Sequence, residues 1–351
     1  MSVIRSVIGK LVDRRNLSDE EAAGAMEDIM SGEATPAQIG AFLTALKMKG
    51  ETVDEITALA RVMREFAIKI KPNVGDELVD TCGTGGDKIK TFNISTAAMF
   101  AAAGAGVKIA KHGNRSVTGK AGSADIMEAL GAKIDLQPSA VQHCIETVGI
   151  GFMFAPVFHV AMKHASLPRW EIGVSTVFNV LGPLTNPAGT RAQVIGVYSS
   201  KLTEKLAHVL ANLGCRRAMV AHGMDGIDEI STLGETKISE LDNGKVRTYS
   251  VRPEDFNLER ATPDSIAGKG LDGNLRILLQ VLCGKLGPCR DIVLLNAAAA
   301  IVVGGKARNL QEGIAAAADA IDSGRAHEKA AQLVQCTGGD ISNLRIVEAS
   351  L

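Results

Sequence analysis

Aromatic residues are scarce in this sequence of 351 residues. They make up 3% of it, with Trp170 as the only tryptophan, whereas hydrophobic residues make up 46%. We therefore expect a core built from small and aliphatic side chains such as alanine and valine. Long apolar runs are also missing, because the stretch 97–107 is interrupted by glycines and is too short to span a bilayer. The composition predicts a globular protein without a membrane partner.

Neither sign of charge is in excess. Lys and Arg number 38 and Asp and Glu number 39, so the formal net charge is -1. Proteins that bind nucleic acids or anionic membranes through charge usually carry an excess of positive side chains. We therefore expect no nucleic-acid partner, and any anion site must be local.

The six cysteines lack CxxC spacing, and the N-terminal residues lack the apolar stretch of a secretory signal. Cysteine-based metal sites and disulfide frameworks are thus not expected. Free thiols and a cytoplasmic location are the expectation.

The first 71 residues carry helix signals and almost no strand signals. Apolar residues recur at helical spacing in 4–11, and three capping boxes follow: Ser18 with Glu21, Thr35 with Gln38 and Thr52 with Glu55. These signals predict a small all-helical domain of about four short helices over 1–71.

From residue 72 the pattern changes to strands alternating with helices, which predicts a largely parallel sheet covered by helices. The expected strands are 78–80, 107–110, 133–135, 151–154, 193–198 and 218–221, with a hairpin over 237–249 around Asn243-Gly244. Two alanine-rich helices are expected at 291–303 and 310–321. The predicted fold class is α/β, with a large domain over 72–351 that follows the small helical one.

A glycine-rich segment, Asp80-Thr81-Cys82-Gly83-Thr84-Gly85-Gly86-Asp87, follows the first expected strand. Glycines let backbone amides approach an anion, and Asn93-Ile94-Ser95-Thr96 offers hydroxyl and amide caps at the start of the next helix. Together they predict a phosphate or diphosphate cradle, although a tight turn explains the glycines alone equally well. The segment lacks GxGxxG and the Lys-Ser or Lys-Thr of a P-loop, so the ligand is not expected to be NAD or ATP.

A second polar segment, Lys111-His112-Gly113-Asn114-Arg115-Ser116-Val117-Thr118-Gly119-Lys120, follows the strand that ends near Ala110. Ligands gather at the carboxyl ends of parallel strands, and cations and hydroxyls at this edge suit a phosphorylated substrate. A solvated basic loop is the alternative. For His112, a structural role and a role in binding are equally well supported.

Two adjacent carboxylates, Asp228 and Glu229, follow the strand 218–221. Carboxylate oxygens at a strand end are what magnesium needs when it also holds a diphosphate. By themselves they are more typical of a solvated loop, and only the other two segments favour a metal site.

In combination, these segments resemble the anthranilate phosphoribosyltransferase family. The match is carried by Gly83-Thr84-Gly85-Gly86-Asp87, Asn93-Ile94-Ser95-Thr96, Lys111-His112-Gly113-Asn114-Arg115-Ser116, Gly122-Ser123-Ala124-Asp125, Phe178-Asn179, Leu181-Gly182-Pro183-Leu184-Thr185-Asn186-Pro187 and Asp228-Glu229. The resemblance extends over essentially the whole chain. It implies the fold shared by nucleoside phosphorylases and phosphoribosyltransferases, in which 165–187 returns to the helical domain and the cleft lies between the domains. It also implies a homodimer formed through the helical domains.

The implied reaction transfers the phosphoribosyl group of 5-phosphoribosyl 1-diphosphate to the amino group of anthranilate, in tryptophan biosynthesis. The resemblance assigns binding of this donor to Gly83, Gly86, Asp87, Thr91, Asn93, Ile94, Ser95, Thr96, Lys111, His112, Gly113, Asn114, Arg115, Ser116, Val117, Thr118, Gly119 and Ser123. It assigns two Mg²⁺ ions to Ser95, Asp228 and Glu229, and anthranilate to Gly83, His112, Asn114 and Arg169. Positioning and electrostatics are expected to dominate catalysis, with His112 and Arg169 as the candidate catalytic residues.

Two positions near the acceptor segment depart from the family pattern. Gly173-Val174-Ser175-Thr176 stands where Gly-x-Arg-Thr is expected, and Trp170 follows Arg169 where a second basic or polar residue is commoner. These departures concern the identity of the acceptor, and leave the donor segments intact. Packing between the two domains is the alternative interpretation of Trp170.

Two rival functions exist on the same fold. Residues 115–128 also resemble the motif of pyrimidine nucleoside phosphorylases, but phosphorolysis needs no magnesium clamp, so Asp228 and Glu229 argue against it. A non-enzymatic relative that binds nucleic acid should be basic, and this chain is not.

Overall fold

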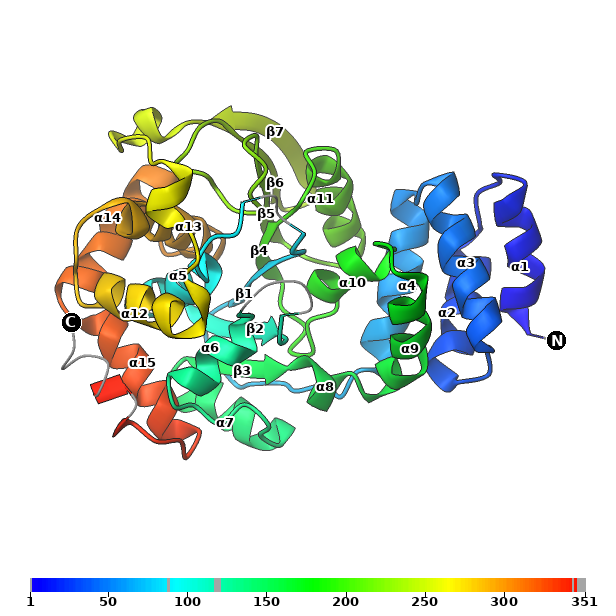
Figure 1. The fold of residues 1–351 in the computed structure, drawn as a ribbon, viewed down its shortest axis with the longest axis horizontal. Helices are drawn as coiled ribbons and strands as arrows, with labels where there is room; N and C mark the ends of the chain where they lie inside the picture. Colours follow the sequence, from blue (N-terminus) through cyan, green and yellow to red (C-terminus); the bar gives the residue numbers. More distant parts are fainter. Residues whose placement is uncertain (1, 87–88, 117–120, 343, 346–351) are drawn as a thin grey trace.

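Four helices form one end of the computed structural model, which describes residues 2–86, 89–116, 121–342 and 344–345. They are α1 (Val3–Val12), α2 (Asp19–Ser31), α3 (Pro36–Lys49) and α4 (Val53–Phe66), shown in blue in Figure 1. All three predicted capping boxes are confirmed, because the hydroxyls of Ser18, Thr35 and Thr52 each accept a hydrogen bond from the amide three residues later. Helix starts are therefore set by local sequence.

A buried ion pair joins α3 to α4. Lys49 Nζ lies 2.8 Å from Glu55 Oε2, and both side chains are almost fully buried. The other oxygen of Glu55 accepts a hydrogen bond from the Leu17 amide at 2.9 Å. Removing either charge alone would leave the other unpaired in the core, so the pair specifies how these helices pack.

Seven strands form one sheet in the order β3-β2-β1-β4-β5-β6-β7. They are β1 (Leu78–Gly83), β2 (Lys108–Gly113), β3 (Ile150–Phe154), β4 (Ala192–Gly196), β5 (Arg217–Gly223), β6 (Thr236–Asp242) and β7 (Lys245–Val251). The first five are parallel, and β6 and β7 form the predicted antiparallel hairpin. The predicted fold class, a small helical domain followed by an α/β domain, is confirmed.

One predicted strand, 133–135, is wrong. These residues form a loop between α6 (Ser123–Ala129) and α7 (Pro138–Thr147). The Lys133 amide donates to Thr337 Oγ1 at 3.2 Å, and Ile134 is buried in the core. The apolar and polar residues alternate because the loop packs beside the C-terminal helices, not because it pairs with a strand.

Helices cover both faces of the sheet (Figure 1). Val194 belongs to the core cluster under the C-terminal helices, and the next residue, Ile195, belongs to the cluster shared with the N-terminal helices. The helices not yet named are α5 (Ile94–Gly104), α8 (Ala155–Phe158), α9 (Lys163–Ile172), α10 (Phe178–Leu184), α11 (Leu202–Asn212), α12 (Gly270–Leu282), α13 (Pro288–Val303), α14 (Leu310–Asp322) and α15 (Arg325–Cys336). Short 3₁₀ turns lie at Val160–Met162, Pro253–Phe256 and Pro263–Ile266. Among the described residues, none of the helices is long and apolar enough to cross a bilayer.

The alanine-rich helices predicted at 291–303 and 310–321 are confirmed as α13 and α14. Small residues let them approach closely, because a Cβ on Gly313 would stand 2.8 Å from the Ala298 carbonyl oxygen. Such packing explains how the chain builds a core with few aromatic residues.

Candidate functional site

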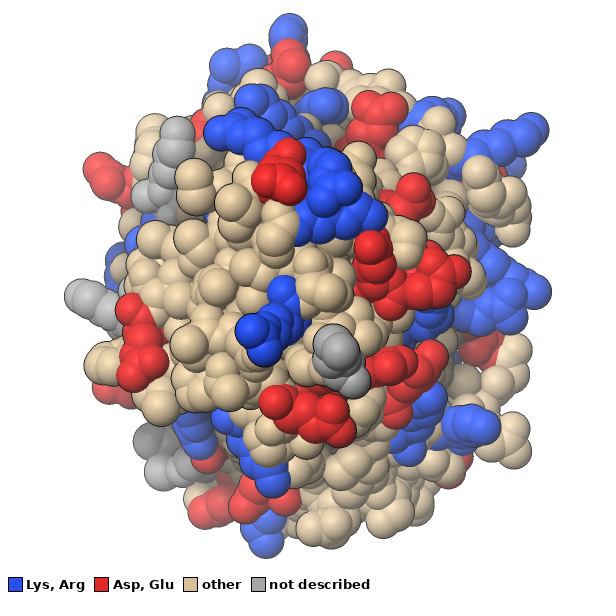
Figure 2. All heavy atoms as spheres, turned by 90° about the vertical axis from the view of Figure 1, so that its right-hand side faces the viewer, with Lys and Arg blue, Asp and Glu red and all other residues tan. Residues whose placement is uncertain are grey.

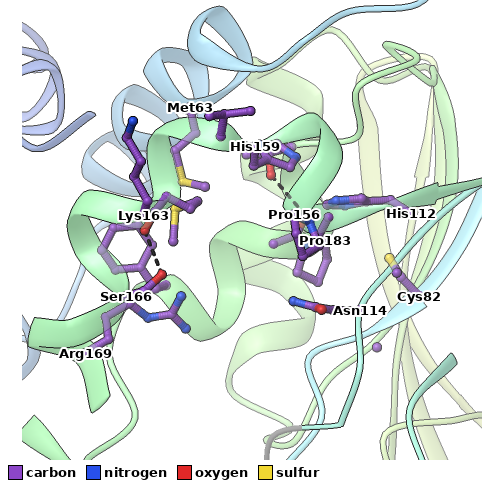
Figure 3. Close-up of a pocket in the computed structure, with 18 residues that line it drawn as sticks. Met63, Cys82, His112, Asn114, Pro156, His159, Lys163, Ser166, Arg169 and Pro183 are labelled. Carbon is purple, nitrogen blue, oxygen red and sulfur yellow. Dashed lines mark hydrogen bonds between the residues drawn. The ribbon is translucent and has the colours of Figure 1, made fainter. Parts of the chain in front are cut away.

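A pocket of about 570 Å³ lies where the carboxyl ends of the strands face α9 and α10. Cys82 and Gly83 end β1, and His112 and Gly113 end β2. Figure 3 shows Lys163, Ser166 and Arg169 entering the pocket from α9, with Met63 of α4 above them. The remaining residues that line it are Asn114, Ala155, Pro156, His159, Val160, Met162, Phe178, Gly182, Pro183 and Thr185. The pocket therefore lies between the sheet and the helical end of the molecule.

The glycine loop after β1 meets the acidic loop after β5. Gly85 and Gly86 have φ of 64° and 83°, a region that suits glycine, and the Gly85 amide donates to Asp228 Oδ2 at 2.9 Å. A Cβ on Gly83 would collide with the same carboxylate oxygen. Two of the predicted segments are thus brought together. Asp87, predicted to bind the donor, lies outside the described residues.

The prediction that the Asn93 side chain caps the next helix is wrong. The structure shows no side-chain cap at the start of α5. Asn93 Nδ2 instead donates to the Ala121 carbonyl at 3.1 Å, and Oδ1 accepts from Asn274 Nδ2 at 3.0 Å. The amide is occupied by these two distant partners, which tie α5 to α12 and to the segment before α6.

The other predicted residues of this segment differ in exposure. Ser95 is half-buried in the first turn of α5, whereas the side chains of Ile94 and Thr96 are buried in the core. These two side chains are therefore not available to a ligand, and the amides of Ile94 and Thr96 already donate to the Phe92 and Asn93 carbonyls. Thr91 lies just upstream, in an isolated bridge with Ala267.

Lys111 points away from solvent. Its side chain is 1% exposed, and Nζ donates to the Thr81 carbonyl and lies 3.3 Å from Ser95 Oγ. Arg115 pairs with Asp125 and Glu128 of α6 at 2.9 and 2.5 Å. The two predicted phosphate-binding cations are therefore both engaged by the protein in this structure.

The turn after β2 is closed by α6. Asp125 Oδ2 accepts from the Ser116 amide at 3.2 Å and from the Gly122 amide at 2.7 Å, and Ser123 Oγ lies 3.5 Å from the Asn114 carbonyl. These contacts hold Asn114 at the mouth of the pocket. Val117, Thr118 and Gly119, also predicted to bind the donor, lie outside the described residues.

Two histidine rings lie side by side at the wall of the pocket. The ring centroids of His112 and His159 are 4.8 Å apart, and the Nε2 atom of each is buried without a hydrogen-bond partner in the described part of the chain. Burial, together with the smaller effect of the neighbouring His159, lowers the pKa of His112 to about 3. Burial likewise lowers the pKa of His159 to about 4. Both rings are therefore neutral at physiological pH.

His159 was missed in the sequence analysis. It follows α8, directly after the carboxyl end of β3, so the same strand-end argument that selected His112 would have selected it.

Arg169 is half-buried in α9, and its guanidinium carbon lies 4.8 Å from the Phe178 ring centroid. Within the described residues it makes no hydrogen bond or ion pair, and burial lowers its pKa. Figure 3 shows it on the opposite side of the pocket from Asn114. A guanidinium that has no hydrogen-bond or ion-pair partner and stands at a pocket wall is suited to bind a carboxylate.

Trp170 and Ser175 face outward. Trp170 is 78% exposed, so it does not pack between the domains of the chain, and that interpretation is wrong. Ser175 is exposed as well, and neither residue lines the pocket.

The acidic loop is fixed by α13. Asn296, which is buried, accepts from the Ile230 amide and donates to the Ile230 carbonyl, both at 2.9 Å. This holds Asp228 and Glu229 at the carboxyl end of β5, with Asp228 against the glycine loop. The described residues contain no cluster of three or more His, Cys, Asp or Glu side chains that could hold a metal. Carboxylate oxygens beside backbone amides do fit magnesium that is bound together with a diphosphate.

Both parts of the chain match models of one protein family. Residues 5–67 match the helical bundle domain of the glycosyl transferase family, and residues 75–327 match its a/b domain.

Relatives and solved structures agree with this match. The anthranilate phosphoribosyltransferase of Acetivibrio thermocellus is 54% identical over 340 residues, covering 97% of this chain and 98% of that protein. The structure of the Thermus thermophilus enzyme of the same name aligns with a TM-score of 0.90 at 41% identity, covering 96% of this chain and 100% of that one. The Saccharomyces cerevisiae enzyme, solved in complex with PRPP and Mg, aligns with a TM-score of 0.87 at 29% identity, covering 95% and 98%. This chain belongs to the anthranilate phosphoribosyltransferase family.

Proposed function

We propose that this protein transfers the phosphoribosyl group of 5-phosphoribosyl 1-diphosphate to the amino group of anthranilate, giving N-(5-phosphoribosyl)anthranilate and diphosphate, in tryptophan biosynthesis. The observation that carries the proposal is the opposition of two anion-binding features across one pocket. Arg169, which has no hydrogen-bond or ion-pair partner among the described residues, forms one wall, and the glycine loop with Asp228 lies beyond the other. An acceptor with both a carboxylate and an amino group fits between them.

The acceptor would bind Arg169 through its carboxylate, and the rest of the molecule would reach Asn114 on the opposite side of the pocket. The guanidinium lies over the ring of Phe178, which helps to hold it in place because an aromatic face attracts a cation. His112 and His159 are neutral, so neither competes with Arg169 for the carboxylate. Their buried Nε2 atoms can accept hydrogen bonds from an amino group after a small movement of the rings.

The donor would bind over the glycine loop and the N-terminus of α5. Backbone amides at Gly83, Gly85 and Gly86 and the positive end of the α5 dipole suit a diphosphate. We also retain Thr91, Asn93, Ser123 and the segment after β2 as donor-binding residues. The proposal also includes Asp87, Val117, Thr118 and Gly119, which lie outside the described residues.

Ser95, Asp228 and Glu229 would hold Mg²⁺, as two ions. Bound magnesium would neutralise charge that develops on the leaving diphosphate. Support comes from the position of Asp228 beside the glycine loop, and from the yeast relative that was solved with PRPP and Mg. Ser95 Oγ accepts from Lys111, an ammonium that can only donate, so its second lone pair remains available to a metal.

The chain's own contribution to the reaction is positioning. The acceptor amine is already neutral near pH 7 and attacks through its lone pair, so a strong general base is not required. The protein must align this nitrogen with the anomeric carbon and exclude water, which closure of residues 1–71 and about 165–187 onto 72–351 would accomplish. No basic group of the pocket needs to take the proton in the transition state.

We further propose a cytoplasmic homodimer that forms through the helical end. Figure 2 shows a broad area of uncharged side chains on this face, interrupted by a basic group near its centre. Met48 of α3 and Val12 at the end of α1 are 69% and 67% exposed. Analytical ultracentrifugation tests the proposal: a mass of two chains is expected, and Met48→Asp should shift it toward one.

The deciding experiment for the reaction is a fluorescence assay with anthranilate, 5-phosphoribosyl 1-diphosphate and magnesium. Loss of anthranilate fluorescence that requires all three components is the expected result. Folded protein without turnover would contradict the proposed acceptor, and turnover of a different aromatic amine would reassign it.

A further inference from the structure

Strands β1 and β2 separate toward the carboxyl ends that carry the site. Their paired residues are Leu78 with Lys108 and Val79 with Ile109. Beyond this point β1 is paired with β4 as far as Gly83, and β2 with β3 as far as Gly113. The space between the two separating strands lies directly beneath the candidate site.

Three buried polar side chains bridge this space: Asp80 of β1, Lys111 of β2 and Asn186 after α10. They are 0%, 1% and 3% exposed. Asp80 Oδ2 accepts from Asn186 Nδ2 at 2.7 Å, and Asn186 Nδ2 also donates to the Ala110 carbonyl of β2 at 2.8 Å. Lys111 Nζ donates back to the Thr81 carbonyl of β1. Side chains thus replace the missing backbone pairs, and we call these three residues the strand bracket.

Each member of the strand bracket contacts a different part of the site. Lys111 Nζ lies 3.3 Å from Ser95 Oγ, on the donor side. Asp80 Oδ1 accepts from the His112 amide at 3.2 Å, on the acceptor side. Asn186 follows Thr185, whose backbone forms a hydrogen bond with the His159 ring, and its own Oδ1 accepts from the Ala188 amide at 2.9 Å. None of the three lines the pocket.

Burial of these charges has an energetic cost that the fold would not carry without compensation. Burial raises the pKa of Asp80 and lowers the pKa of Lys111, and each of the two charges opposes the shift of the other. Removing one partner leaves an uncompensated buried charge, whereas removing both does not. This difference allows stability and positioning to be separated by mutation.

We propose that the strand bracket of Asp80, Lys111 and Asn186 is a positioning device, which sets the distance between the donor-side Ser95 hydroxyl and the acceptor-side His112. The inference rests on the proposed function. It gives Lys111 a role different from the direct grip on the donor that the family resemblance implies. A misplacement of the reacting groups by about 1 Å is enough to lower a rate by about a hundredfold.

The central test replaces Lys111 with Met, which keeps the length of the side chain and removes the ammonium. Lys108→Met is the matched control, because Lys108 lies on the same strand at the opposite end. Positioning predicts that kcat falls by about a hundredfold in Lys111→Met and is unchanged in Lys108→Met. Donor affinity, measured by calorimetry with magnesium and without acceptor, should change by less than about threefold. A rise in the donor Kd of about tenfold or more, with kcat retained, would overturn the proposal.

The double variant Asp80→Asn/Lys111→Met keeps the proposal testable if the single variant unfolds. Removal of both charges should give a higher Tm than Lys111→Met alone, while kcat stays low. Recovery of the parent kcat together with the Tm would mean that the strand bracket only stabilises the fold. Asn186→Ala is a third variant, in which both charges remain. It should lower kcat without raising the donor Kd. A raised donor Kd with unchanged kcat would contradict the positioning role. Lack of turnover by the parent enzyme would instead be a failure of the proposed function.

Discussion

The Asp228 carboxylate accepts a hydrogen bond from the Gly85 backbone amide, with 2.9 Å between Oδ2 and N, although the residues are 143 positions apart. An acidic side chain of the loop after β5 thus uses an amide of the loop after β1. A diphosphate bound over the glycine loop requires donors of this same kind. Donor binding must therefore share this amide or release Asp228 from it, and release makes the carboxylate available to a metal ion.

Gly85→Val tests the diphosphate cradle. The added side chain would stand where the backbone must approach phosphate, so the donor Kd should rise at least about tenfold, or about 1.4 kcal/mol. Gly85 has φ of 64° with open space around its Cβ position, and Gly214, with φ of 82° and open space, is a matched control for backbone strain. Donor calorimetry on Gly85→Val and Gly214→Val separates the two effects. Equal donor affinity in both folded variants would remove the glycine loop from the site.

Arg169→Lys tests the acceptor carboxylate site. Lysine keeps the charge but loses the two-pronged contact, so KM for anthranilate should rise by about tenfold with little change for the donor. Arg216→Lys is the control, since Arg216 is exposed and pairs with Glu77 at the opposite ends of the strands. Steady-state kinetics with each substrate varied in turn gives the answer. If both KM values rise together, Arg169 braces the helical end instead of binding anthranilate.

Asp228→Asn combined with Glu229→Gln tests the metal assignment. The double variant removes two charges at nearly constant volume, so activity should fall by about a hundredfold or more and recover partly at high magnesium. Glu254→Gln with Asp255→Asn is the control, because it removes an adjacent acidic pair from an exposed 3₁₀ turn. Parent enzyme should bind magnesium weakly alone and more tightly with donor. An unchanged magnesium dependence at saturating substrates would rule out these carboxylates as ligands.

Acid should destabilise the fold through His112 and His159. Their folded pKa values of about 3 and about 4 lie below the ordinary value of 6.5, so the unfolded chain binds protons that the folded chain does not. The stability that they contribute is complete above pH 6.5 and is lost as the pH falls from 6.5 through the folded values of about 4 and about 3. Tm measured across this range should fall less steeply in His159→Gln than in His208→Gln, an exposed control on α11. Parallel slopes would contradict buried neutral rings.

Short-range patterns in the sequence were sufficient to predict much of the secondary structure. The capping boxes at Ser18, Thr35 and Thr52 were predicted because both partners lie within four residues. The helices α13 and α14 and the β6–β7 hairpin follow from periodicity and turn residues that are equally local. The glycine and acidic segments were recognised as parts of one site only through their resemblance to a family.

Contacts between distant residues were not predictable in this way. The alternation in 133–135 predicted a strand, but the amide partner is the Thr337 hydroxyl, about two hundred positions later. The Asn93 side chain was predicted to cap a helix, yet Asn274 and the Ala121 carbonyl compete successfully for it. The position of His159 after β3 was a signal that the sequence analysis missed, but its place beside His112 depends on the pairing of β2 with β3.

By itself, the sequence determined the class of fold, the starts of α2, α3 and α4 and the chemical types of the site residues, because these depend on side-chain period and near neighbours. Only the tertiary structure decided which polar side chains are available to bind a ligand. It directs the Lys111 ammonium into the space between β1 and β2, engages Arg115 with α6, and leaves Arg169 at the pocket wall without a hydrogen-bond or ion-pair partner among the described residues. The physical reason is that burial and hydrogen-bond partners, which set the direction and charge state of a polar side chain, come from residues far away in the chain.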